Sequence, residues 1–166
     1  IILIIVFLVG LSVMLYPAVS DYWNSKTQSH AIAEYDEILN NMDDKQYQKL
    51  LSEAEDYNER LKSLYSPLEN YSEIEGYENS LDVTGTGIMG YVTIPEISVE
   101  LPIYHGTSDE VLNVAVGHVQ GSTLPIGGKS THSVISAHRG LPSAKLFSDL
   151  DELSEGCLLY TSPSPR

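Results

Sequence analysis

Five histidines are the residues of this sequence best suited to acid–base chemistry: His30, His105, His118, His132 and His138. An imidazole changes its charge near neutral pH, so each could serve as a general acid or base. The closest pair, His132 and His138, has five residues between its members, but no pair of cysteines accompanies it, so a zinc site is not expected. The single cysteine, Cys157, allows neither an internal disulfide nor a multi-cysteine metal site. The sequence therefore predicts no metal and no cofactor.

His138 has the most favourable position for catalysis. It ends a buried strand pattern over 133–137 and enters a turn rich in glycine and proline, where side chains on a rigid scaffold meet solvent. His118 follows a shorter apolar stretch and is a weaker candidate on the same grounds. For both, the alternative is a structural histidine with satisfied hydrogen bonds. We expect His30 and His132 to be surface residues.

These side chains must be positioned by a chain that opens with an apolar run from Ile1 to Tyr16, without a charge before Asp21. The run is slightly shorter than the roughly 20 residues of a full membrane span, which suggests that upstream residues complete it. We predict an incomplete transmembrane anchor over residues 1–20. A signal-peptide core is the alternative, because Pro17 to Ser20 offers a small-residue cleavage site.

Residues 21–64 have the periodicity of a helical arm. Apolar residues recur at three and four positions, and Asp43 followed by Gln46 indicates a capping box that begins a second helix. We expect two amphipathic helices packed on a neighbouring domain, with a coiled-coil dimer arm as the alternative. Residues 65–87 then form either a plain linker or a lid across a site. The glycines of the 84–87 stretch predict a flexible joint there.

From residue 88 to 156 the patterns predict strands over 88–94, 99–103 and 133–137, with short helices over 108–116 and 143–150. The absence of a βαβ rhythm favours a mostly antiparallel sheet or barrel. Residues 157–166 carry two prolines among the last four, so we expect no continuing strand and interpret this stretch as a non-native tail.

The composition also excludes a class of partners. With 23 acidic and 9 basic residues, the formal net charge is −14. Binding to a phosphate backbone requires clustered Lys and Arg, so nucleic acid is not an expected partner. Hydrophobic residues make up 42% of the chain, which is enough to build a core.

Several motifs, in the same order along the chain, are similar to those of the class C (pilus-assembly) sortases. They are Gly87–Pro95 (GIMGYVTIP), Leu101–Thr107 (LPIYHGT), Gly117-His118, Leu124–Gly128 (LPIGG) and Ser136–Gly140 (SAHRG). The resemblance covers about residues 1–156. It implies a mostly β fold: a partial sortase-type β-barrel over 88–156, preceded by the transmembrane helix and the helical arm.

The resemblance further implies a cysteine transpeptidase that cleaves an LPXTG-like sorting signal and joins it to an amine, in pilin polymerisation or cell-wall attachment. His138 corresponds to the catalytic histidine of the family. The family's nucleophilic cysteine and its arginine lie beyond the matched stretch, so neither Cys157 nor Arg139 takes those roles. The chain is thus expected to be an inactive front part of its parent enzyme.

The implied partners are LPXTG-type surface proteins or pilins. The implied location is the cell membrane, with a single-pass anchor and an extracytoplasmic catalytic domain. The Asp-Pro-aromatic tripeptide that the family often places in its lid is absent, and Ser66-Pro67-Leu68 occupies that region. The alternative function is a membrane-anchored extracellular binding or structural module without catalysis.

Overall fold

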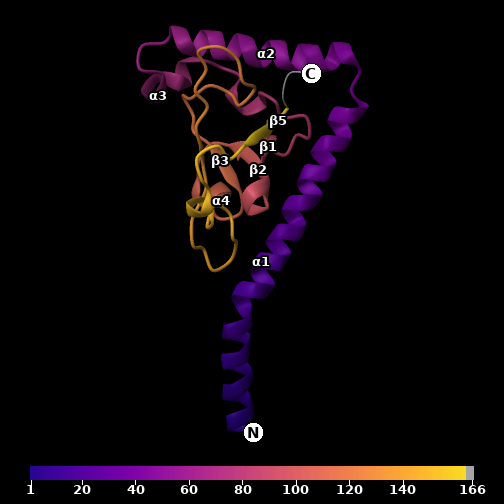
Figure 1. Ribbon diagram of the computed structural model, residues 1–166, viewed down its shortest axis with the longest axis vertical. Helices are drawn as coiled ribbons and strands as arrows, with labels where there is room; N and C mark the ends of the chain where they lie inside the picture. The colour runs from indigo at the N-terminus through magenta and orange to yellow at the C-terminus, as the bar shows by residue number, and fades with distance from the viewer. Residues whose placement is uncertain (164–166) are drawn as a thin grey trace.

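The computed structural model describes residues 1–163. Two long helices, α1 (Ile2–Asn41) and α2 (Asp44–Ser63), meet at an elbow, and a small sheet with its loops fills the angle between them (Figure 1). The lower part of α1 extends away from this body with its side chains exposed.

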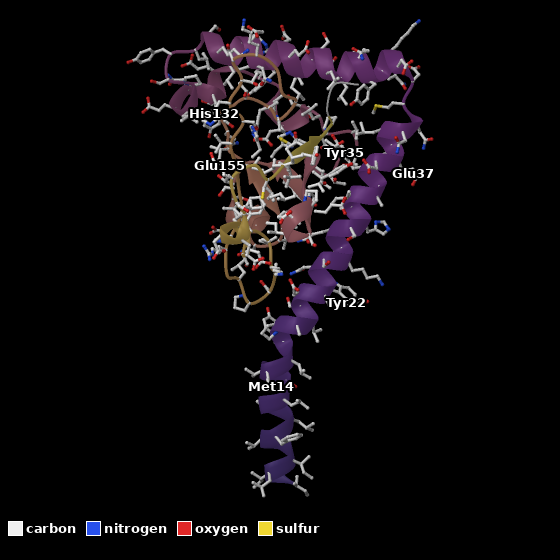
Figure 2. The ribbon with its side chains drawn as sticks, viewed as in Figure 1. Met14, Tyr22, Tyr35, Glu37, His132 and Glu155 are labelled. Carbon is white, nitrogen blue, oxygen red and sulfur yellow. The ribbon has the colours of Figure 1, made fainter. Side chains whose placement is uncertain are left out.

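Helix α1 has two halves of different character. Its first half is apolar and exposed. Within residues 1–163, α1 is the one helix that is long and apolar enough to span a membrane. Pro17 lies inside the helix and removes one backbone hydrogen bond, and α1 changes direction between Met14 and Tyr22 (Figure 2). The second half buries Ile32, Tyr35 and Leu39 against the sheet domain.

The predicted arm of two helices is present. The Asp43 side chain accepts a hydrogen bond from the Gln46 backbone N–H at 2.8 Å, and the Gln46 side chain accepts one from Asp43 N–H at 3.2 Å. This capping box begins α2 as expected. The buried face of α2 packs on the common core through Tyr47, Leu51, Ala54, Tyr57 and Leu61.

The sheet has five strands in the order β4-β3-β2-β1-β5. Their bounds are β1 Ile88–Ile94, β2 Val99–His105, β3 Val116–His118, β4 Ile135–Ser136 and β5 Tyr160–Ser162. All neighbouring pairs are antiparallel except β2 and β3. Within residues 1–163 the sheet stays open, with β4 and β5 at its edges. This is a partial barrel on a helical arm, as the motifs indicated.

Three local features differ from the sequence patterns. The strand expected over 133–137 shortens to Ile135–Ser136, and the helix expected over 108–116 shortens to α4, Asp109–Leu112. No helix forms over 143–150, where turns lead into the 3-10 helix η4, Leu150–Glu152. The Phe147 N–H donates to the His138 carbonyl oxygen, and the Ser143 carbonyl oxygen accepts from Asn24, so contacts outside the segment replace the helical hydrogen bond between Ser143 and Phe147.

The tail also differs from expectation. Tyr160–Ser162 forms β5 and pairs antiparallel with β1, ending immediately before Pro163. Gly90 of β1 permits this pairing, because a Cβ there would meet the Ser162 carbonyl oxygen. The interpretation of 157–166 as non-native stays a prediction, and its residues 164–166 lie outside the part described here.

The 65–87 segment consists of α3 (Pro67–Asn70), the 3-10 turns η1 (Tyr71–Glu73) and η2 (Tyr77–Asn79), and a loop. The loop was expected to be a flexible joint. In the structure the Asp82 carboxylate accepts hydrogen bonds from the backbone N–H groups of Gly85 at 2.8 Å, Thr86 at 3.2 Å and Gly87 at 2.9 Å. The backbone N–H groups at the end of this loop are therefore bound by a single carboxylate, that of Asp82.

Candidate active site

His138 lies two residues beyond Ser136, the last residue of β4, and is half-buried. Its carbonyl accepts a hydrogen bond from Phe147 N–H at 3.2 Å, which closes the loop that follows. Its imidazole makes no hydrogen bond to any residue within 1–163. Both ring nitrogens are thus available for exchanging protons with a ligand.

Arg139 and Cys157, the arginine and the cysteine of this sequence nearest to His138 along the chain, contact other residues. Arg139 forms an ion pair with Asp151 at 2.9 Å, with both side chains largely exposed. The Cys157 sulfur lies 3.4 Å from the backbone nitrogen of Ser154, and no hydrogen bond connects it to His138. Neither residue forms a hydrogen bond or ion pair with the imidazole within residues 1–163.

His118 is fully buried, and both of its ring nitrogens lie within hydrogen-bonding distance of other residues. Its Nδ1 lies 2.9 Å from the Tyr77 hydroxyl, and its Nε2 lies 3.0 Å from the Thr123 carbonyl oxygen and 3.1 Å from Ser122 Oγ. A carbonyl only accepts, so Nε2 carries the proton and Nδ1 accepts from Tyr77. Burial lowers the pKa of His118 to about 4. The structural interpretation of this histidine therefore holds.

His105 also serves structure. Its Nδ1 lies 2.9 Å from the Gly87 carbonyl oxygen and its Nε2 lies 2.8 Å from that of Ser80. Its ring packs edge-on against Tyr77, with centroids 5.1 Å apart. The ring thus joins the end of β2 to the 65–87 segment, a role that spacing in the sequence could not reveal. His30 and His132 are exposed, as expected.

The 65–87 segment contacts strand β3 through Tyr77 and the 121–134 loop through α3. Gly121 approaches the backbone of α3 so closely that a Cβ would lie 2.6 Å from the Leu68 Cα and from the Pro67 oxygen. A cavity of about 270 Å³ lies at this junction. Its lining joins the end of α2, α3 and the 121–134 loop, and includes Leu61, Pro67, Leu68, Ser122, Thr123 and His132.

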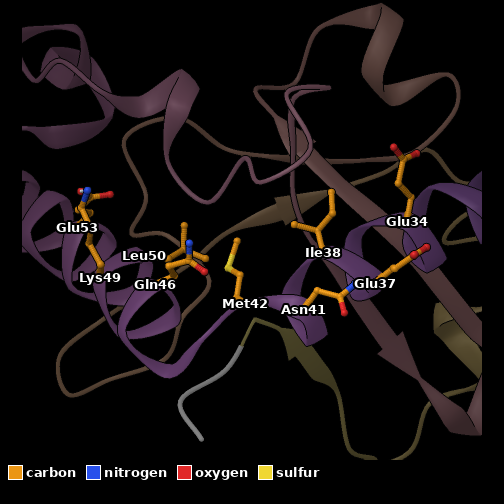
Figure 3. Close-up of a pocket in the computed structure, with 9 residues that line it drawn as sticks. All are labelled: Glu34, Glu37, Ile38, Asn41, Met42, Gln46, Lys49, Leu50 and Glu53. Atoms are coloured by element: carbon orange, nitrogen blue, oxygen red, sulfur yellow. Dashed lines mark ion pairs between the residues drawn. The ribbon is translucent and has the colours of Figure 1, made fainter.

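A larger cavity of about 730 Å³ opens at the elbow of α1 and α2 (Figure 3). Its lining residues come from the two helices and from the turn between them: Glu34, Glu37, Ile38, Asn41, Met42, Gln46, Lys49, Leu50 and Glu53. It contains no histidine or cysteine, so its size does not make it the catalytic cleft. Residues 1–163 contain no group of three or more His, Cys, Asp or Glu side chains arranged to hold a metal ion.

Comparison with known proteins places the chain beside one group of enzymes. The family model described as "Sortase domain" matches residues 92–164. Sortase C1 from Streptococcus agalactiae superposes with a TM-score of 0.70 at 43% identity, covering 80% of this chain and 69% of that one.

A sortase C from Streptococcus pneumoniae, whose structure was described in connection with catalysis and pilin substrate specificity, matches with a TM-score of 0.67 at 38% identity. That match covers 80% of this chain and 67% of the other. A lid mutant of the S. agalactiae enzyme matches with a TM-score of 0.67 at 38% identity, over 78% of this chain and 66% of that one. A search of curated proteins found no match.

Proposed function

Because this chain belongs to the class C sortases, a group of cysteine transpeptidases, we propose that His138 is the catalytic histidine of its parent enzyme. This assignment rests on the exposure and the hydrogen bonding of the imidazole ring. Of the histidines that the motifs made candidates, His118 is fully buried with both nitrogens bonded. His138 is half-exposed two residues beyond β4, and neither of its ring nitrogens bonds to another group within residues 1–163.

In the reaction, a thiolate of the parent enzyme attacks the Thr-Gly carbonyl carbon of an LPXTG-like signal. The C–N bond breaks, and the protonated His138 imidazole donates its proton to the leaving amine. The resulting thioester is attacked by an amine, such as a pilin lysine. The neutral imidazole then accepts the proton of that amine, while the C–S bond breaks and the thiolate is restored.

The 65–87 segment is proposed as a lid over the substrate cleft. Its support is the close approach of α3 to Gly121 and the anchoring of Tyr77 on His118, together with the existence of a lid in the S. agalactiae relative. Ser66, Pro67 and Leu68 stand in place of the Asp-Pro-aromatic tripeptide, so that position of the lid offers neither the carboxylate nor the ring. We expect it to cover the cleft by backbone packing rather than by a charged plug.

The first half of α1 is proposed as the membrane anchor, with the sheet domain on the extracytoplasmic side. Its support is the exposed apolar surface of residues 1–16, followed by the exposed aromatic rings of Tyr16, Tyr22 and Trp23. Aromatic residues gather at the membrane–water interface. Trp23 is the only tryptophan of the sequence, so quenching of its fluorescence by brominated lipids in vesicles tests this directly. Quenching only by a water-soluble agent would contradict the anchor.

The catalytic assignment is tested in the full-length gene product with an LPXTG-type peptide and an amine acceptor. His138→Ala should lower transpeptidation by roughly 10²–10⁴-fold, the usual contribution of a positioned acid–base group. His132→Ala, a change at an exposed histidine six residues earlier, is the matched control and should have little effect. Retained turnover in His138→Ala would refute the assignment. Peptide binding without any turnover in the wild type would favour the binding module instead.

A further inference from the structure

The loop that follows His138 is attached to the arm where the arm leaves the apolar segment. Asp21 Oδ1 accepts a hydrogen bond from the backbone N–H of Lys145 at 2.8 Å. One helical turn on, Asn24 Nδ2 donates to the carbonyl oxygen of Ser143 at 2.7 Å. Figure 1 shows this loop, between β4 and η4, reaching down beside α1. Both contacts engage backbone groups, so they fix the path of the loop whatever its side chains are.

The covalent route from this attachment to His138 is short. Lys145, whose N–H is bound by Asp21, is separated by a single residue from Phe147, whose N–H donates to the His138 carbonyl oxygen. A displacement of the loop on the arm is therefore transmitted through three consecutive residues to the backbone of the histidine.

The intervening residue makes the connection stiff. Leu146 has a φ of +39°, in the left-handed region that a residue with a branched side chain rarely adopts, and its side chain is buried. Such a conformation persists only where surrounding contacts hold it. Ala144 and Phe147, close to Leu146 in the chain, are also buried. The Lys145 side chain forms an ion pair with Asp149.

We propose that Asp21 and Asn24 are positioning residues for His138: by docking the 139–149 loop on α1, they set where the imidazole is presented. This inference rests on the proposed catalytic role of His138. It adds that the arm next to the apolar segment helps to build the active site, so that the reactive imidazole keeps a fixed place relative to the membrane helix.

The test uses the 166-residue chain in detergent micelles or nanodiscs, with amide exchange at Lys145 and Phe147 and the His138 ring resonances as readouts. Asp21→Ala should raise both exchange rates by about tenfold, because it removes the stabilisation that a hydrogen bond to a charged group provides. It should also shift the His138 ring resonances. Asp21→Asn keeps an acceptor oxygen and should restore both. Ser25→Ala, at an exposed position on the same helix, is the matched control.

The outcomes separate this inference from the proposed function. Unchanged exchange in Asp21→Ala and Asn24→Ala would overturn the docking. Faster exchange without any change at the His138 ring would overturn the positioning role and leave only a structural contact. In the full-length gene product the same variants should lower kcat with little change in KM. Because the exchange and ring measurements need no turnover, they remain valid even if the transpeptidase assay fails.

Discussion

The hydroxyl of Tyr77 lies 2.9 Å from Nδ1 of His118, and this contact joins the 65–87 segment to strand β3. The same hydroxyl accepts a hydrogen bond from the Gly106 backbone N–H at 3.0 Å. Desolvation of the buried phenol raises the pKa of Tyr77 well above its ordinary value, so the hydroxyl keeps its proton and remains a donor. The proposed lid is thereby attached to the core near its middle through a neutral tyrosine–histidine pair.

Removing this hydroxyl should destabilise the domain. Tyr77→Phe leaves His118 Nδ1 and Gly106 N–H without their partner in a buried site, and such unsatisfied groups lower the free energy of unfolding by about 1–3 kcal/mol. Urea unfolding followed by circular dichroism in micelles measures the difference. Tyr65→Phe removes a hydroxyl from an 88% exposed ring and should change nothing. Equal stability of the two variants would show that the pair contributes no net stabilisation.

Stability should fall in mild acid because of His118. Its pKa is about 4 in the folded chain and about 6.5 in the unfolded chain, since burial disfavours the charged imidazole. Between these values the unfolded chain binds a proton that the folded chain does not. The free energy of unfolding therefore decreases by about 3 kcal/mol as the pH falls from about 6.5 to about 4.

The direct measurement for His118 is the NMR titration of its ring in the folded protein. The ring should remain neutral at pH 5.5, whereas a midpoint near 6.5 would contradict the inferred burial effect. His30→Gln changes an exposed histidine and should leave the pH dependence of stability as it is in the wild type.

Docking of α3 should depend on the glycine at position 121. In Gly121→Ala the new methyl group meets the Leu68 and Pro67 backbone at 2.6 Å, so α3 must move away. Gly127→Ala is a matched control, because Gly127 has a similar φ of +74° but no neighbour within 4 Å. The control isolates the strain of a positive φ, about 1 kcal/mol. We expect Gly121→Ala to raise amide exchange in α3 (Pro67–Asn70) and Gly127→Ala not to; similar exchange in both would exclude a specific contact.

The 166-residue chain itself should not cleave a sorting-signal peptide. Cys157 has no hydrogen bond to His138, and the arginine beside that histidine is paired with Asp151. Incubation with a fluorogenic LPXTG-type peptide should give no thiol-dependent signal, with the full-length gene product as the positive control. Cleavage that disappears in Cys157→Ser would instead make this cysteine a nucleophile.

Much of the fold was already encoded in local sequence patterns. The capping box at Asp43 and Gln46 depends on two residues three positions apart, and the apolar stripes of α1 and α2 depend on helical periodicity. The histidine turn at Ser136–Gly140 is likewise a contiguous motif, which is why His138 could be singled out without coordinates. In each of these cases the interacting or recognised residues are close neighbours in the chain.

The tertiary structure decided what depends on residues far apart in the chain. Tyr77 and His118 are 41 positions apart and Asp21 and Lys145 are 124 apart, so no local pattern reveals that either pair meets. Distant contacts also replaced the helix expected over 143–150. The Ser143 carbonyl oxygen accepts a hydrogen bond from Asn24 and the Phe147 N–H donates to the His138 carbonyl oxygen, so the helical hydrogen bond between Ser143 and Phe147 does not form. Only folding could distinguish the buried, neutral His118 from the half-exposed His138, because that difference lies in the desolvation and hydrogen bonding of each ring.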